Sequence, residues 1–254
     1  MLTAPQYVEI FLLGVCGSVI GSIVGLGGGF VVIPLLRLAF NIEPSVVSGT
    51  SLVFVLANVA AGSIGYLRQK RVDLSIALPL SIGGVPGSVL GVVLVHRLSA
   101  AWFDYAYGGV LLFLFLLIMR RRTQESVADG TKTIAHNWPV AIAAGVLLGL
   151  VSSLFGIGGG IVTVPLLLVA ARMRPHVVSA TSGFVILLTA PVGIVAHAVS
   201  HDIDWIAAVP LVAGGLTGGW IAPGIARRLS ARTLVTLLGV AVLAAVCGLV
   251  LRHI

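Results

Sequence analysis

A short glycine-rich motif occurs twice in this 254-residue chain, and it constrains the fold more than any other feature. Residues 25–34 read GLGGGFVVIP, and residues 156–165, which lie 131 positions later, read GIGGGIVTVP. Each glycine in the triplet costs roughly 1 kcal/mol in a helix relative to alanine, and glycine also permits left-handed turns. The motif therefore predicts a broken helix in each copy, followed by a short second helix whose N-terminal N–H groups face the break. Such a helix end attracts anions.

The segments around the two breaks have the length and composition of membrane helices. Of all residues 58% are hydrophobic and only 9% are charged, which excludes an ordinary soluble domain. Since about 20 apolar residues cross a bilayer, the sequence predicts an all-α polytopic membrane protein. Its apolar segments are residues 7–25, 44–67, 74–96, 99–119, 138–155, 175–200, 205–226 and 230–251. The run after the first triplet is expected to end at Pro34 to Arg37, and the run after the second at Ala171, so both are predicted half-helices.

The chain consists of two homologous halves. These are residues 1–120 and 138–254, joined by a polar linker at 121–137. Each half is expected to hold one glycine-broken, re-entrant or discontinuous helix and three transmembrane helices. Asp73 and Asp204 occupy equivalent positions just before apolar spans, where a helix N-cap is expected. Glycines within the spans, namely Gly83, Gly84, Gly87, Gly214, Gly215 and Gly218, are expected to let helices pack closely.

The distribution of Lys and Arg predicts that the two halves are inverted relative to each other. If each broken segment returns to the side on which it began, twelve of the 15 basic residues lie on one side and three, Arg37, Arg97 and Arg252, on the other. This matches the positive-inside rule, and it places the linker inside and both termini outside. If the broken segments cross fully, the split is eight against seven and carries no bias. The 19 residues before the first break are long enough for that alternative.

The net charge of +7 does not indicate nucleic-acid binding, because the basic residues form short clusters between apolar spans. No GxxxxGK[ST] loop for ATP is present in the chain, and no metal site or cofactor is expected. The partners predicted are a small anion and the lipid bilayer. The sequence leaves the oligomeric state open.

The repeated pattern GxGGGxxxxPxL, followed about ten residues later by PxVVSxTS, resembles the TauE/SafE sulfite exporter family, also called the toluene-sulfonate uptake permeases. The resemblance covers nearly the whole chain except the linker. It implies a permease of the bacterial inner membrane for sulfur-containing anions of the sulfite, thiosulfate, sulfonate or sulfoacetate type. This family is usually described with seven or eight crossings in parallel halves, so the inverted repeat departs from that description.

The candidate substrate-binding residues are the two glycine triplets and polar side chains on the helix that follows each of them. Backbone this irregular is tolerated at membrane depth only where it lines a cavity or is buried in protein, and hydroxyl groups are neutral donors to an oxyanion. In the first half these residues are Gly27, Gly28, Gly29, Ser48, Thr50, Ser51 and Asn58. In the second half they are Gly158, Gly159, Gly160, Ser179, Thr181, Ser182 and Thr189. No catalytic residue is expected.

Two other functions stay open beside the secondary transporter. A passive anion channel could use the same helix ends, and electrogenic flux without a coupling ion would identify it. Ser182 with His197 would suit an intramembrane hydrolase, although the serine is also explained by the duplication and His197 is expected to be structural or interfacial. Any proton coupling is expected to use the substrate's own protonation or Glu9, because a membrane-buried carboxylate is the usual proton relay.

Overall fold

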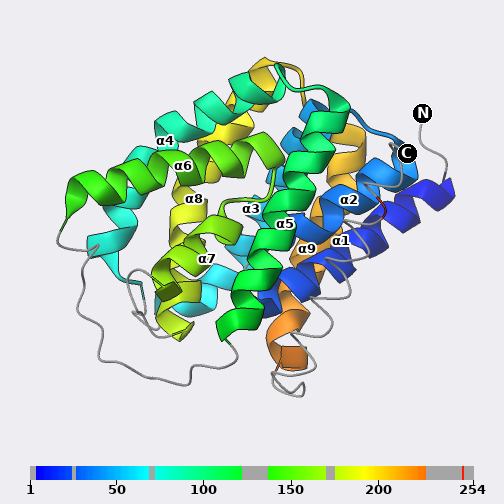
Figure 1. Ribbon diagram of the computed structural model, residues 1–254. Coiled ribbons are helices and arrows are strands. Elements are labelled where there is room, and N and C mark those ends of the chain that lie inside the picture. The colour runs from blue at the N-terminus through cyan, green and yellow to red at the C-terminus, as the bar shows by residue number, and fades with distance from the viewer. Residues whose placement is uncertain are drawn as a thin grey trace.

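The chain folds into a bundle of helices, shown in Figure 1. The computed structural model describes residues 4–24, 27–68, 72–121, 137–169, 175–226 and 248. The helices are α1 (Ala4–Val24), α2 (Gly29–Phe40), α3 (Pro44–Arg68), α4 (Leu74–Val95), α5 (Ala100–Arg121), α6 (Trp138–Phe155), α7 (Gly160–Val169), α8 (Pro175–Val199) and α9 (Trp205–Ala226). Six of them, α1, α3, α4, α6, α8 and α9, are long and apolar enough to cross a membrane. The prediction of an all-helical, multi-pass protein is confirmed, while the expected helix at 230–251 lies outside the described residues except at residue 248.

The short helices after the breaks exist, and α2 is longer than expected. It continues through Pro34 and Arg37 to Phe40. Proline has no amide hydrogen, so Pro34 cannot donate to the carbonyl four residues earlier, that of Phe30. The buried Tyr107 hydroxyl of α5 donates to this carbonyl at 3.2 Å. A side chain from another helix thus replaces the missing bond and lets α2 continue.

Neither short helix can cross a bilayer alone. α2 has 12 residues and α7 has 10. At 1.5 Å per residue they span about 18 and 15 Å, whereas the hydrocarbon core is about 30 Å thick. Both therefore end or begin at membrane depth.

The two halves interlock through equivalent helix pairs. α1 packs on α9 of the other half, and α6, the equivalent of α1, packs on α4, the equivalent of α9. A Cβ atom placed on Gly14 would lie 3.2 Å from the Gly214 Cα, and one on Gly145 would lie 3.1 Å from the Gly83 Cα. Gly145 is the repeat equivalent of Gly14, and Gly214 is the repeat equivalent of Gly83, since each pair is 131 positions apart. The same glycine contact between the halves is therefore made twice. The prediction that Gly83 and Gly214 permit close packing is confirmed.

Two further bonds repeat in the same way. The Asp204 N–H donates to Thr50 Oγ1 at 3.0 Å, and the Asp73 N–H donates to Thr181 Oγ1 at 3.1 Å. Both aspartates are N-caps, as expected: the Asp73 carboxylate accepts from the Ser75 N–H at 3.1 Å, and the Asp204 carboxylate accepts from the Ile206 N–H at 3.0 Å. Each half therefore positions the first turn of a long helix of the other half.

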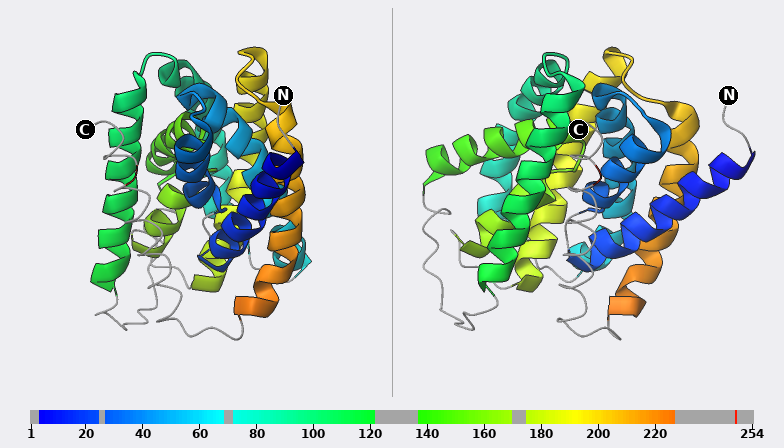
Figure 2. Two further views of the ribbon diagram at one scale, coloured as in Figure 1. Left: turned by 90° about the vertical axis from the view of Figure 1, so that its right-hand side faces the viewer. Right: turned by 45° about the vertical axis from the view of Figure 1, so that its right-hand side comes forward.

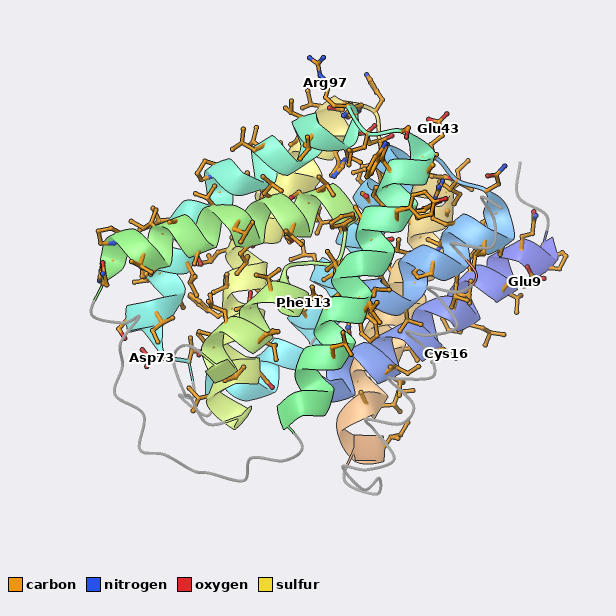
Figure 3. The ribbon with its side chains drawn as sticks, in the orientation of Figure 1. Glu9, Cys16, Glu43, Asp73, Arg97 and Phe113 are labelled. Atoms are coloured by element: carbon orange, nitrogen blue, oxygen red, sulfur yellow. The ribbon has the colours of Figure 1, made fainter. Side chains whose placement is uncertain are left out.

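Equivalent helices run in opposite directions in Figures 1 and 2. Residues 41–43, 96–99 and 200–204 lie together, and we call this the Glu43 end; Asp73 marks the opposite end (Figure 3). α3 starts at the Glu43 end whereas α8 finishes there, and α4 finishes there whereas α9 starts there. This arrangement supports the inverted repeat, and the sidedness of the protein in the membrane stays a prediction.

Cysteine labelling checks that sidedness. After Cys16 and Cys247 are replaced by alanine, we expect Arg97→Cys at the Glu43 end to react with an impermeant maleimide in intact cells, because this end is predicted to face outside. Asn137→Cys, at the last position of the linker, should react only after the membrane is permeabilised. Both native side chains are exposed, so access by itself does not distinguish them. Labelling of Asn137→Cys alone in intact cells would contradict the orientation. Other labelling positions that the sequence suggests, namely Gln124, Ser126, Thr3 and His253, lie outside the described residues.

Candidate functional site

The described part of the first break between α1 and α2 holds two glycines in a left-handed conformation. Gly27 has φ 82° and Gly28 has φ 83°, a region that residues with a Cβ atom rarely adopt. The Gly28 carbonyl accepts from the N–H groups of Val31 and Val32, which begins α2. The N–H groups of Gly29 and Phe30 then have no acceptor within the helix.

The second break repeats this geometry between α6 and α7. Gly156, Gly158 and Gly159 have φ values of 68°, 82° and 73°. The Gly159 carbonyl accepts from the Val162 N–H at 3.0 Å and from the Thr163 N–H at 2.9 Å. The predicted helix breaks are therefore confirmed in both halves, with equivalent glycines starting α2 and α7.

The two breaks meet in one buried region between α3 and α8. A Cβ atom on Gly29 would lie 2.9 Å from the Gly156 carbonyl oxygen. Val55 of α3 lies against both breaks, because one of its methyl carbons would be 3.0 Å from a Cβ on Gly27 and 2.2 Å from one on Gly158. The described residues of both breaks are buried. The N-terminal ends of two half-helices thus approach the centre of the protein from opposite directions.

Most of the predicted hydroxyl ligands have partners within the protein. Thr50 and Thr181 accept from the N-caps described above, and Ser48 Oγ donates to the Leu154 carbonyl at 2.8 Å. Thr189 Oγ1 donates to the Val185 carbonyl in its own helix at 2.9 Å. Ser179 also has a partner. These side chains hold helices together in the conformation that the structure describes.

Ser51 and Ser182 differ from the other predicted hydroxyl ligands. They occupy equivalent positions on α3 and α8, are fully buried, and have no hydrogen-bond partner within the described part of the chain. Each lies about one helical turn before a residue that contacts the breaks, Val55 in α3 and Ile186 in α8. An unsatisfied buried hydroxyl costs roughly 1–3 kcal/mol of stability. Because such a serine is present at the equivalent position of both halves, we expect it to have a role other than stability.

Asn58 supports the first break. Its Nδ2 donates to the Gly27 carbonyl at 3.0 Å, and its Oδ1 accepts from Ser22 Oγ at 2.8 Å and from Ser18 Oγ at 2.6 Å. Ser18 and Ser22 were not predicted from the sequence, because nothing in the repeat distinguishes them. Also not predicted was Ser152, a buried and unpartnered hydroxyl whose Cβ would be 3.4 Å from a Cβ on Gly159.

A buried carboxylate was also missed. Asp104 in α5 is 1% exposed, and both of its oxygens bind the Arg37 guanidinium of α2, at 3.0 Å from Nε and 2.5 Å from Nη2. Arg37 Nη1 donates to the Ile42 carbonyl at 2.6 Å. Glu9 was expected to be the one carboxylate inside an apolar segment that could relay a proton, and this expectation is wrong, because Asp104 lies within the segment 99–119. Glu9 is exposed near the N-terminal end of α1, whereas the first break follows the C-terminal end of that helix (Figure 3).

The hydrolase hypothesis fails on geometry. Ser182 and His197 lie on one helix, 15 residues and about 22 Å apart, beyond any direct proton transfer. The two ring nitrogens of His197 instead face the Asp202 carboxylate and the Ser153 carbonyl, at 3.0 and 2.9 Å.

The fold and the paired breaks define a polytopic helical membrane protein whose centre is formed by two half-helix ends. The family model for sulfite exporter TauE/SafE matches residues 10–249, so the chain belongs to the TauE/SafE family. It is 29% identical to the probable membrane transporter protein YunE of Bacillus subtilis, covering 98% of this chain and 99% of that protein. It is 30% identical to a probable membrane transporter protein of Xylella fastidiosa, covering 85% and 84%. No solved structure matches the chain.

Family membership and the apolar helices identify a multi-pass membrane transporter of the bacterial inner membrane, and the family and these relatives are transporters rather than enzymes.

Proposed function

We propose that this protein is a secondary transporter that carries a small sulfur-containing anion, of the sulfite, thiosulfate, sulfonate or sulfoacetate type, across the cytoplasmic membrane. The anion binds between the N-terminal ends of α2 and α7. The observation that carries the proposal is the meeting of two equivalent left-handed breaks beside two equivalent, buried and unpartnered hydroxyls, Ser51 and Ser182. The choice of a sulfur oxyanion rests on the family, which is named for sulfite export.

The chemistry of the region suits an anion that must also be released. Helix N-termini carry a partial positive charge and free N–H groups, and this charge acts more strongly in a buried site than in water. The described residues that line the breaks are neutral, and the nearest buried cation on α2, Arg37, is bound to Asp104. Neutral donors bind an oxyanion without the strong attraction that a buried ammonium or guanidinium would add.

The burial of the breaks supports transport by alternating access. Ser51 and Ser182 are inaccessible in this conformation, so an anion reaches them only after one end of the bundle opens. Halves 1–120 and 138–254, arranged as inverted repeats around the linker at 121–137, would supply two equivalent ways to open, one toward each side of the membrane.

Transport by the purified protein tests this function. Proteoliposomes should take up labelled sulfite, thiosulfate or methanesulfonate, and a large excess of the same unlabelled anion inside should accelerate the entry of label by exchange. Exchange is characteristic of a carrier. Uptake that follows the membrane potential without exchange or coupling would indicate the passive channel instead, and uptake of none of the three anions would contradict the proposed substrate class.

Ser51 and Ser182 provide the sharpest test of the site. A hydrogen bond to a charged group is worth about 1.5–3 kcal/mol, so Ser51→Ala or Ser182→Ala should raise the dissociation constant of the transported anion roughly 10- to 100-fold. Neither change removes a bond within the described structure, so the thermal stability of the detergent-solubilised protein should not fall. Isothermal titration calorimetry and differential scanning fluorimetry measure the two effects.

Ser48→Ala is the matched control, because Ser48 already donates to Leu154. It should lower stability and change anion affinity much less than Ser51→Ala or Ser182→Ala does. Unchanged affinity in both the Ser51 and the Ser182 variants would remove these hydroxyls from the site.

A further inference from the structure

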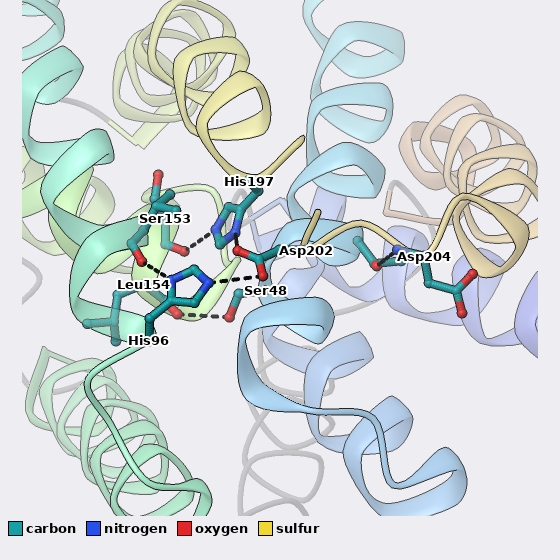
Figure 4. A network of polar contacts seen from close by, with 9 residues as sticks. Ser48, His96, Ser153, Leu154, His197, Asp202 and Asp204 are labelled. Atoms are coloured by element: carbon teal, nitrogen blue, oxygen red, sulfur yellow. Dashed lines mark hydrogen bonds and ion pairs between the residues drawn. The ribbon is translucent and has the colours of Figure 1, made fainter. Parts of the chain in front are cut away.

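Two histidines share one aspartate at the Glu43 end of the protein (Figure 4). His96, just after α4, places Nε2 3.1 Å from Asp202 Oδ1. His197, near the end of α8, places Nδ1 3.0 Å from Asp202 Oδ2. His197 is fully buried, Asp202 is 4% exposed, and the His96 side chain is 41% exposed. The three side chains form a chain of titratable groups that runs from the surface into the protein.

The other nitrogen of each imidazole faces a backbone carbonyl. His96 Nδ1 lies 2.8 Å from the Val92 oxygen, and His197 Nε2 lies 2.9 Å from the Ser153 oxygen. A carbonyl oxygen only accepts, so both of these nitrogens must carry a hydrogen. The remaining two ring nitrogens face the carboxylate of Asp202, and each of these contacts also needs a hydrogen, on the nitrogen or on the oxygen.

Counting hydrogens gives the charge that this His96–Asp202–His197 unit has when all four contacts are hydrogen bonds. Its four contacts need four hydrogens. Two neutral imidazoles and one protonated carboxyl group hold three, so the complete network contains one more proton than the neutral unit and has a net charge of +1. When that proton leaves, one contact sets two lone pairs against each other and must open.

We infer that the His96–Asp202–His197 unit binds the proton that is transported together with the anion. This inference rests on the proposed anion transport and assigns its coupling ion. The proton enters through the exposed His96, and the resulting charge of +1 compensates the charge of an anion bound at the breaks.

The unit is joined directly to the second break. His197 holds the Ser153 carbonyl, and Ser48 Oγ holds the next carbonyl, that of Leu154. Both residues lie in the last turn of α6, which ends at Phe155 and is followed by the left-handed Gly156. Loss of the proton opens a contact of the unit and so loosens the attachment of His197 to the last turn of α6. The resulting shift of this turn moves the glycines that present N–H groups to the anion.

The duplication does not explain the unit. The positions equivalent to His197, Asp202 and His96 are Tyr66, Arg71 and Arg227, so the equivalent positions of the repeat hold no such set. This set of titratable groups therefore breaks the symmetry of the repeat, and it lies at the Glu43 end, where a proton can arrive from one side of the membrane.

Other charged groups at the Glu43 end do not substitute for it. Arg97, His201 and Glu43 are exposed, and the Asp204 carboxylate caps α9. From the packed helices, α3 presents the backbone of Gly49 and α6 presents Ser153 and Leu154, none of which titrates. The Arg37–Asp104 pair is a separate contact between α2 and α5.

Proteoliposomes that contain a pH-sensitive dye test the inference. Thiosulfate and methanesulfonate are the probes, because both stay ionised near neutral pH and bring no proton of their own. In the wild type, an inward anion gradient should acidify the lumen, and an inward proton gradient should accelerate anion entry. Asp202→Asn should reduce the proton-driven entry at least tenfold and leave anion exchange within about twofold.

Asp204→Asn is the matched control: it makes the same chemical change two residues away, and asparagine is an equally good N-cap. It should preserve both activities. His96→Gln, on the exposed side of the unit, is a second variant that should uncouple protons if Asp202→Asn fails to fold. Anion uptake without proton movement in the wild type, or full proton-driven uptake in a folded Asp202→Asn or His96→Gln variant, would overturn the inference, whereas uptake of neither probe would contradict the proposed function itself.

Discussion

Gly159→Val should abolish anion transport while the protein still folds and reaches the membrane. Gly159 has φ 73°, and its carbonyl starts α7. A β-branched residue in this conformation costs about 1–3 kcal/mol, and its side chain lies beside the N–H groups that are proposed to bind the anion. The nearest atom to a new Cβ would be Leu148 Cδ2 at 2.9 Å, the end of a flexible side chain that can move. The change therefore affects the break more than the packing around it.

The equivalent change in the first half should be more severe. A Cβ on Gly28 would lie 2.6 Å from the Gly17 carbonyl oxygen, and this backbone of α1 cannot rotate away. Gly28→Val should therefore lose transport and also lower the yield of folded protein, although the two glycines have the same place in the repeat.

Gly109→Ala is a suitable control, because a Cβ at that position meets nothing within 4 Å and alanine favours a helix. Its transport and yield should match the wild type. Binding of the anion by calorimetry and uptake in proteoliposomes separate the possible results for Gly159→Val. Retained binding in well-folded protein would show that the break is a hinge or packing site and that the anion is held elsewhere.

The helices and their breaks were predictable from sequence because their causes are local. The length of an apolar run and the position of a glycine triplet predicted α6 and α9 with the bounds that the structure has, and predicted the starts of α3 and α8. The packing role of Gly83 was also evident, since small residues in membrane helices commonly mark close contacts. α2 was predicted too short because the partner of the Phe30 carbonyl, Tyr107, lies 77 residues away.

The roles of individual polar residues depend on tertiary contacts and were not predictable. Thr50 and Ser51 are neighbours in the same motif, but only Thr50 faces the first turn of α9. Ser51 has no partner among the described residues and lies one helical turn before Val55, which contacts both breaks. The importance of Asp202 was hidden in the same way, because His96 lies 106 positions earlier in the chain.

Removing one partner of the buried ion pair between Arg37 and Asp104 should lower stability more than breaking any other polar contact among the described residues. The pair joins the half-helix α2 to α5 through two hydrogen bonds, and both side chains are almost completely buried. Removing one partner of a buried pair typically costs about 3–5 kcal/mol, because the other charge stays buried without compensation. Asp104→Leu should therefore lower the midpoint of thermal unfolding strongly in detergent micelles and reduce the yield from membranes.

Removing both charges tests whether this loss comes from the remaining charge or from the change in shape. Arg37→Met with Asp104→Leu replaces the pair with apolar side chains of similar size, a change that is often neutral or stabilising at a buried site. The double variant should recover most of the stability lost in Asp104→Leu, apart from the bond between Arg37 and the Ile42 carbonyl. Anion exchange should return with it, because neither side chain touches the glycine breaks. If Asp104→Leu alone unfolds at the wild-type temperature, the pair does not fix α2 against α5, and the position of the first half-helix must depend on Tyr107 and the apolar core.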